Sequence, residues 1–506
     1  MYQTLLIRRY LTSRIMPLLA ALAVLLCTAM VLIVWSVMGG FLNMLLASGR
    51  TMMGDVLISW PVVGMAHYQE LIDDLEADPL VLAATPIVES PGLLATPDGS
   101  IAMVQVIGID GRGYDRVTGY SDAVWWRNLE KPMPRDTDGD DPRLHADFTG
   151  VFEDALRMSG RDPRTGEDAP AMVLGVEVSQ LNQRVPGGWY EPRYLQLRTD
   201  SATLSVLPIS ARGVAIDVQA RSFPIVNQFR TGIYEVDART VLVRLDALQE
   251  MLGMAAATRV RVPGSADADP LGLGVTLDER GEPVFAQPEI VGASPARVTT
   301  VLVRAQDGVS AQRLRDRTAE IYRDFAQRHG RAVPSPDSIP ILTWEQRPSI
   351  AAFIGAVKKE TGLVLFIFGF ISMTSVFLVL AIFWSMVSEK TKDIGVLRAV
   401  GAGRAGVAWL YLGYGLAIGV VGATLGGLLA LVVVHNINPI HDWMGSTLGL
   451  VVWDPSVYYF FEIPNRVEPS KAIMVMCAGV LFSVAGALLP AIKAAHMDPV
   501  KALRFE

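Results

Sequence analysis

The chain has 506 residues, 51% of them hydrophobic, and a formal net charge of -7. This acidic balance, without any basic stripe interleaved with aromatic residues, argues against a nucleic-acid partner. The two cysteines, Cys27 and Cys477, fall inside apolar runs, so the polar middle of the chain has no disulfide framework even if it faces an oxidising compartment. Long uncharged runs near both ends predict an integral membrane protein.

The N-terminal part of the chain predicts one membrane helix. Residues 1–14 mix apolar and basic residues, which is typical of an amphipathic helix on the inner membrane surface, although a simple positive flank explains them equally well. Residues 15–38 carry no charge and reach about 36 Å as a helix, enough to cross a hydrocarbon core of about 30 Å. A cleaved signal peptide has a shorter apolar region of about 7–15 residues, so we expect a retained span.

The polar middle, residues 39–361, has the composition of a soluble domain. Runs rich in β-branched residues predict strands, and apolar residues with helical spacing predict helices. The predicted strands are 56–60, 101–109, 194–199, 240–245 and 298–305, and the predicted helices are 67–76, 245–252 and 310–329. Because short strands and helices alternate without clean βαβ units, we predict an α+β domain.

Residues 131–170, within a polar insertion at about 111–170, are dense in Asp, Pro, Gly and Arg and are predicted to be a solvated surface segment. Its DTDGDD run is similar to a calcium loop, but the glycine comes too early, at Gly139, and no Glu follows at the required distance. His145 and the other histidines show no metal-ligand spacing, so the sequence predicts no metal site. No P-loop, G-x-S-x-G or H-E-x-x-H motif occurs, so we expect no catalytic residues, and any ATP hydrolysis must belong to another polypeptide.

Three further apolar runs, at 362–387, 407–434 and 472–492, predict membrane helices. The run at 407–434 is rich in glycine, and small residues let helix backbones approach closely in a bilayer. We therefore expect this helix to pack against a neighbour. No span has a charged residue at its centre, which disfavours a proton- or ion-coupled carrier.

Lys and Arg residues flank the four spans on one side only. They precede the first span, lie in 388–406 between the second and third, and lie in 493–506 after the fourth. The positive-inside rule therefore places both termini in the cytoplasm and residues 39–361 and 435–471 outside. The expected location is the cell inner membrane.

The inner segment 388–406 contains a short helical pattern. Its apolar residues recur at i, i+3 and i+6 (Ile394, Leu397 and Val400), its charged side carries Lys390, Asp393 and Arg398, and it ends at Gly401. This pattern is typical of a helix that docks in a groove of a cytoplasmic partner. The composition of this segment is also consistent with a positively charged cytoplasmic loop that binds no partner.

Six segments carry a family resemblance: SVMGGF (36–41), FRTGIYEVDARTVLVRLDALQEMLGM (229–254), TWEQR (343–347), EKTKDIGVLRAVGA (389–402), VYYFFEIP (457–464) and LLPAIKAAHMDPVKALRFE (488–506). Together they resemble the FtsX/MacB-type ABC transporter permease family, and most closely its lipoprotein-releasing (LolC/LolE-like) subfamily. The inner and C-terminal motifs are shared across the wider superfamily. SVMGGF and GIYEVD narrow the resemblance toward lipoprotein release, although Gly39 replaces the usual Asn of the first motif.

The resemblance implies a mechanical relay. Two permease chains, identical or paralogous, pair with a cytoplasmic dimer of ABC ATPase subunits, which binds the ATP and Mg, so no cofactor is expected in this chain. A lipoprotein or lipid-like substrate is pulled from the outer leaflet and handed to a periplasmic lipoprotein carrier. The implied ATPase contacts are Glu389, Lys390, Asp393, Ile394, Leu397, Arg398 and Gly401.

A lipid path is expected at the outer ends of the first two spans. Each buried CH₂ is worth about 0.8 kcal/mol, so removing two or three acyl chains needs tens of kcal/mol unless a lipophilic surface replaces the bilayer. The candidate residues are Val37, Met38, Phe41, Phe353 and Ile354. Ordinary helix packing explains these residues equally well.

Three other functions remain open at this point. A MacB-like export or efflux permease, working with an adaptor and an outer-membrane duct, is weakened by the missing fused ATPase domain. An FtsX-like regulator that transmits the ATPase state to an extracytoplasmic hydrolase is weakened by the size of the outer domain. A membrane-anchored enzyme has no motif in its favour.

Overall fold

The computed structural model describes residues 15–48, 52–97, 99–126, 150–178, 182–185, 189–192, 200–209, 216–261, 275–277, 283–285, 289–450, 452–453 and 462–503. These residues form two compact units. The helical unit comprises the described residues of Met1–Leu46, Ala352–Asp454 and Glu462–Glu506, and the mixed unit those of Ala47–Ala351.

Four helices in the described part of the chain are long and apolar enough to cross a membrane. They are α2 (Ile15–Ser48), α11 (Pro348–Glu389), α13 (Arg404–His435) and α16 (Pro469–Ala495). The predicted architecture is confirmed: one membrane helix precedes an α+β domain and three follow it. Each helix continues past its predicted apolar run at one or both ends. The longest, α11, has 42 residues, or about 63 Å of helix.

Glycines let α13 approach two of its neighbours. A methyl group added to Gly415 would lie 2.7 Å from Ala487 Cβ on α16, and one added to Gly426 would lie 2.5 Å from Leu25 O on α2. Both distances are shorter than a normal van der Waals contact, so only glycine fits. The expectation that the glycine-rich helix packs against a neighbour is confirmed.

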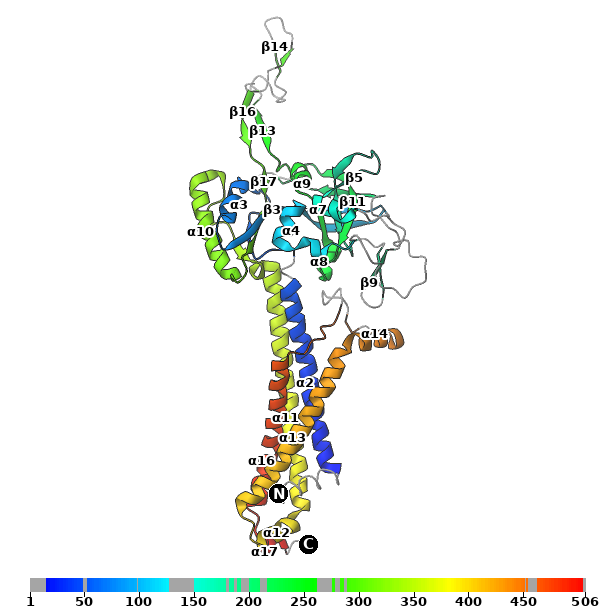
Figure 1. Cartoon of the computed structure of the whole chain (residues 1–506), viewed down its shortest axis with the longest axis vertical. Helices are drawn as coiled ribbons and strands as arrows, with labels where there is room; N and C mark the ends of the chain where they lie inside the picture. The colour runs from blue at the N-terminus through cyan, green and yellow to red at the C-terminus, as the bar shows by residue number, and fades with distance from the viewer. Residues whose placement is uncertain are drawn as a thin grey trace. The chain divides into compact units, whose positions relative to one another are not determined.

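Short helices lie at the two ends of the helical unit. Helix α12 (Thr391–Ala399) packs against α17 (Pro499–Leu503) at one end, and α14 (Ile437–Leu448) follows α13 at the other (Figure 1). Helix α14 lies in the segment 435–471, for which the sequence pattern predicted an outside location but no helix. Trp443 and Leu448 of α14 are more than half exposed, which is typical of a helix lying at a membrane interface.

The mixed unit is built on a nine-stranded sheet with the strand order β10-β11-β7-β12-β4-β3-β18-β1-β19. Strands β11 and β7 pair in parallel, as do β12 and β4, while the other neighbours are antiparallel. The strand bounds are β1 (Val56–Ser59), β3 (Val81–Ala95), β4 (Ile101–Ile109), β7 (Met172–Gly175), β10 (Ser201–Val206), β11 (Gln219–Phe229), β12 (Thr240–Arg244), β18 (Thr300–Ala305) and β19 (Ile341–Thr343).

Both faces of this sheet are buried. Successive residues of a strand point to opposite faces, so Val56 and Ile58 of β1 join one apolar cluster and Leu57 joins the other. The first cluster includes residues of α3 (Tyr68–Glu76), α9 (Leu245–Met251) and α10 (Ala311–His329). The second includes residues of α4 (Gly111–Thr118), α5 (Tyr120–Ala123) and α7 (Val151–Arg157).

The remaining elements are short. They are the strand pairs β2 (Met65–Ala66) with β17 (Arg297–Val298), β5 (Ser159–Arg161) with β6 (Asp168–Pro170), β8 (Asn182–Val185) with β9 (Trp189–Pro192), β13 (Ala257–Arg261) with β16 (Glu289–Ser294), and β14 (Val275–Leu277) with β15 (Pro283–Phe285), together with α8 (Tyr234–Arg239), η1 (Gly330–Ala332) and η2 (Trp344–Gln346).

The prediction of a solvated surface segment at 131–170 is wrong at Ala155 and Met158, and the earlier part of the wider insertion at 111–170 also has buried residues. Tyr114 and Tyr120 are fully buried, and Ala155 and Met158 are buried against the same face of the sheet. Residues 127–149, which carry the DTDGDD run, lie outside the described residues, as do the predicted strand at 194–199 and the N-terminal segment 1–14.

Candidate functional site

The first candidate site is the surface formed by α12 and its flanks. Helix α11 ends at Glu389, and α12 starts two residues later. Ile394, only 2% exposed, belongs to an apolar cluster that also contains Val407 of α13 and Ala494 of α16. One side of α12 is therefore held by the ends of three membrane helices.

Arg398 fastens α12 to the end of α16. Its Nη1 donates a hydrogen bond to the carbonyl oxygen of Ala495, the last residue of α16. The final carbonyls of a helix lack partners within that helix and carry partial negative charge, so a guanidinium is favoured there. Arg398 therefore positions α12, which differs from the outward-facing role that the sequence pattern suggested.

The outward face of α12 mixes apolar and charged side chains. Val396 is 51% exposed and Val400 is 84% exposed, and Lys392, Asp393 and Ala399 are exposed beside them. The predicted apolar face of Ile394, Leu397 and Val400 is therefore wrong for Val400. Six residues of an α-helix rotate by about 600°, which places Val400 about 120° away from Ile394.

The other sequence-predicted residues lie in the same segment. Glu389 and Gly401 are exposed, Leu397 is half-buried, and Lys390 Nζ forms an ion pair with Asp393 Oδ2 at 2.7 Å. Gly401 ends the helical segment with a φ of 107°, a conformation that favours glycine. The structure thus brings all seven predicted residues to one end of the helical unit. The exposed Lys392, Val396 and Ala399 were missed, although their helical spacing was visible in the sequence.

The TWEQR motif fastens the start of α11 to the sheet of the mixed unit. Thr343 ends β19, and Gln346 Oε1 accepts a hydrogen bond from the Thr343 N–H at 3.2 Å, completing a capping box. Trp344 is buried. Arg347 Nη2 lies 2.9 Å from Glu89 Oε1 on β3, and both side chains are partly buried. The motif therefore ties the beginning of a membrane helix to two strands.

The GIYEVD motif has a structural role around Asp237. This fully buried carboxylate accepts hydrogen bonds from Thr231 N at 2.7 Å, Thr231 Oγ1 at 2.8 Å and Gly232 N at 3.0 Å. Burial raises the pKa of Asp237 to about 7, although these hydrogen bonds act in the opposite direction. Gly232 has a φ of 85°, so its place in the turn favours glycine.

The proposed lipid-path residues are mostly covered within this chain. Val37, Phe41 and Ile354 are 8%, 6% and 7% exposed, and Met38 is half-buried. The Phe41 ring contacts Trp453 edge to face, with 5.9 Å between centroids. The side chain of Phe353 lies outside the described residues. Helix packing accounts for these contacts, and the lipid path stays a prediction.

The sequence comparisons point to FtsX-like permeases. Residues 365–499 match the family described as FtsX-like permease C-terminal. The lipoprotein-releasing system transmembrane protein LolC of Neisseria meningitidis serogroup B is 23% identical over 427 residues, covering 84% of this chain and 79% of that protein. The LolC of Xylella fastidiosa is 26% identical over 208 residues, covering 40% of this chain and 48% of that protein, so the match spans about half of this relative. The periplasmic region of MacB from Actinobacillus actinomycetemcomitans is 9% identical at a TM-score of 0.29, covering 60% of this chain and 94% of that structure.

Proposed function

Because the chain belongs to the FtsX/MacB-type permease family, close to its LolC and LolE members, we propose that it is the membrane subunit of a lipoprotein-releasing ABC transporter. The proposal assigns ATP hydrolysis to a separate cytoplasmic subunit. One observation carries it: α12 presents an exposed outward face. In chain order this helix lies between the membrane helices α11 and α13, inside the segment 365–499 that matches the family.

The ATPase contact is proposed to be this face. Val396 and Val400 offer apolar area, and Lys392, Asp393 and Glu389 surround it with charge. Exposed apolar side chains inside a charged rim are typical of a docking surface. Ile394 and Arg398 act indirectly, because they hold α12 against the bundle.

The relay is proposed to run along α11. This helix continues without interruption from Pro348, next to the Arg347–Glu89 ion pair, to Glu389, next to α12. An uninterrupted helix transmits a displacement along its axis, since its backbone hydrogen bonds resist stretching. A movement of α12 by the ATPase is then felt at the sheet of the mixed unit.

The membrane orientation follows from charge. The lysines and arginines of 388–406 and 493–506 are proposed to face the cytoplasm, with both termini, and the mixed unit to face the periplasm. A second permease chain, identical or paralogous, is proposed to complete the transporter. The relatives' names, lipoprotein-releasing system transmembrane protein, support lipoprotein release as the activity. Lipoproteins are then proposed to be taken from the outer leaflet of the inner membrane and passed to a periplasmic carrier.

The contact with the ATPase is tested by matched valine substitutions. Val400→Asp places a carboxylate on α12 where the side chain is 84% exposed, and Val452→Asp makes the same change beyond α14, where it is 62% exposed. Both variants should insert and fold normally, because neither buries the new charge. We expect Val400→Asp, and likewise Glu389→Lys, to lose co-purification of the ATPase, and Val452→Asp to retain it. Equal ATPase recovery from all variants would rule out this docking surface.

The transported substrate is tested separately by depletion. If the chain releases lipoproteins, triacylated lipoproteins accumulate in the inner membrane within the time that the protein disappears. Val400→Asp expressed in depleted cells should fail to reverse this accumulation, whereas Val452→Asp should reverse it. Normal lipoprotein sorting after depletion favours export or hydrolase regulation instead.

A further inference from the structure

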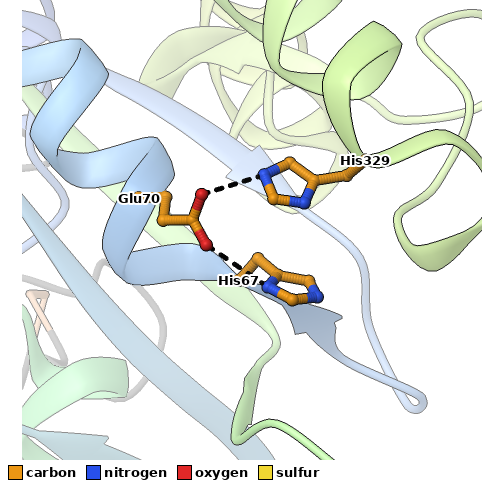
Figure 2. Close-up of side chains that lie close together, drawn as sticks. All are labelled: His67, Glu70 and His329. Carbon is orange, nitrogen blue, oxygen red and sulfur yellow. Dashed lines mark ion pairs between the residues drawn. The ribbon is translucent and has the colours of Figure 1, made fainter.

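Three potential metal ligands meet at the edge of the mixed unit. His67 precedes α3, Glu70 lies in the first turn of α3, and His329 is the last residue of α10. Figure 2 shows the Glu70 carboxylate facing both imidazole rings. One oxygen lies 3.5 Å from His67 Nδ1 and the other lies 3.2 Å from His329 Nε2.

We propose that these residues form a binding site for a divalent transition metal, with zinc as the preferred ion. Zinc bonds of about 2.0–2.2 Å to nitrogen and oxygen place tetrahedral ligand atoms about 3.3–3.5 Å apart. Each Glu70 oxygen lies near this distance from one of the two nitrogens, and one ligand atom from each residue lies within 4.8 Å of the other two, so small side-chain rotations bring the three ligand atoms to the tetrahedral spacing. Two imidazoles and one carboxylate leave the fourth position for water.

The His329 ring nitrogen supports a metal over a simple ion pair. Nε2 of His329 is buried and makes no hydrogen bond to any described residue, although the Glu70 carboxylate lies beside it. A buried polar atom without a hydrogen bond is costly, and a metal ion satisfies it. A zinc ion would accept the ring-nitrogen lone pair of each imidazole.

The backbone holds His67 in an uncommon conformation. His67 has a φ of 56° and a ψ of 23°, the left-handed region that non-glycine residues seldom adopt. This conformation places its ring against that of His329, with 4.5 Å between centroids and an interplanar angle of 24°. Metal binding requires the two rings to tilt apart so that their lone pairs converge. The side chain of His67 is 31% exposed, which leaves room for this rotation.

The surrounding charges favour a cation. Arg328, the nearest basic residue on α10, is paired with Asp74 of α3, so its charge is compensated. Glu70 is the carboxylate between the rings, and neutral imidazole with carboxylate is a donor set that zinc accepts. The bound ion joins the start of α3 to the end of α10, so it is expected to stabilise this part of the mixed unit.

The test uses the full-length protein in detergent, purified without a polyhistidine tag and stripped with a chelator. Zinc binding is measured by titration and by metal analysis after gel filtration, and Co²⁺ absorption reports the coordination geometry. The variants are His67→Ala, His329→Ala and Glu70→Gln, with His496→Gln as the control for loss of a histidine elsewhere. Glu70→Gln is the most conservative, because this side chain is 55% exposed.

We expect about one zinc ion per wild-type chain and a rise in the unfolding temperature on zinc addition. Each ligand variant should weaken binding by at least about tenfold and lose the temperature rise, while His496→Gln behaves as the wild type. The proposal is overturned if the wild type binds no zinc at micromolar concentration. It is also overturned if Glu70→Gln and His329→Ala bind as the wild type does, since the metal is then held elsewhere.

Discussion

Replacing Gly426 with alanine tests whether α13 and α2 pack backbone to backbone. A methyl group on Gly426 would lie 2.5 Å from Leu25 O, 3.0 Å from Thr28 Cβ and 3.2 Å from Leu25 Cα. These neighbours are backbone atoms and a Cβ atom of α2, so no side-chain rotation can move them away. The two helices must separate locally by about 1 Å to restore van der Waals distance, and overpacking of this kind costs about 1–3 kcal/mol.

The matched control is Gly369→Ala in α11, where no atom lies within 4 Å of the added methyl group. Alanine has a higher helix propensity than glycine by up to about 1 kcal/mol, so the control should be neutral or stabilising. We expect opposite signs for the two variants in the free energy of unfolding. The measurement is unfolding in mixed micelles with increasing SDS, followed by tryptophan fluorescence. If Gly426→Ala is as stable as Gly369→Ala, the close packing of α13 on α2 is refuted.

Three further predictions concern the mixed unit and α12. Burial raises the pKa of Asp237 to about 7 from its ordinary value of 3.8. The folded state therefore holds an extra proton between these values, and stability falls by up to about 4 kcal/mol as the pH rises from 4 to 7. Asp237→Asn should flatten this dependence in thermal unfolding between pH 5 and pH 8. Ile394→Asp buries an unpaired charge, so we expect it to lose ATPase binding and expose α12 to proteolysis. Reversing both charges of the Arg347–Glu89 pair should retain transport, whereas either single reversal should impair it.

The sequence predicts the fold best where a local pattern and burial agree. The strands β1, β4, β12 and β18 follow runs of β-branched residues, and α10 begins one residue after its predicted start. The central strand β3 was missed because Pro86 and Pro91 lie within it and proline lacks a donor for the ladder. The register shows how β3 accommodates them: Pro86 pairs with Val301 and Pro91 with Gln105, and other residues supply the ladder.

The sequence predicts only those features of the candidate sites that depend on residues close together in the chain. The helical segment at 388–406 and its end at Gly401 follow from the sequence, but the outward face does not, because Arg398 turns inward to Ala495. This contact is set by tertiary packing. The proposed metal site also depends on tertiary packing. His67 and His329 meet because α3 and α10 pack together, and their spacing along the chain does not predict this contact.

The Arg347–Glu89 pair offers a test of the proposed relay along α11 that leaves the proposed ATPase contact on α12 unchanged. The pair lies 2.9 Å apart with side chains 31% and 15% exposed. An exposed pair is worth about 0–1 kcal/mol, whereas a partly buried, charge-assisted hydrogen bond is worth about 1.5–3 kcal/mol. Glu89→Arg leaves two cations together, and Arg347→Glu leaves two carboxylates, so each should loosen the start of α11. The double reversal restores attraction at the same place. If the relay runs through α11, lipoprotein release should fall in both single variants and recover in the double variant, while ATPase co-purification stays constant in all three. A single reversal that leaves release unchanged, or a double variant that fails to recover, would refute the proposed relay through α11.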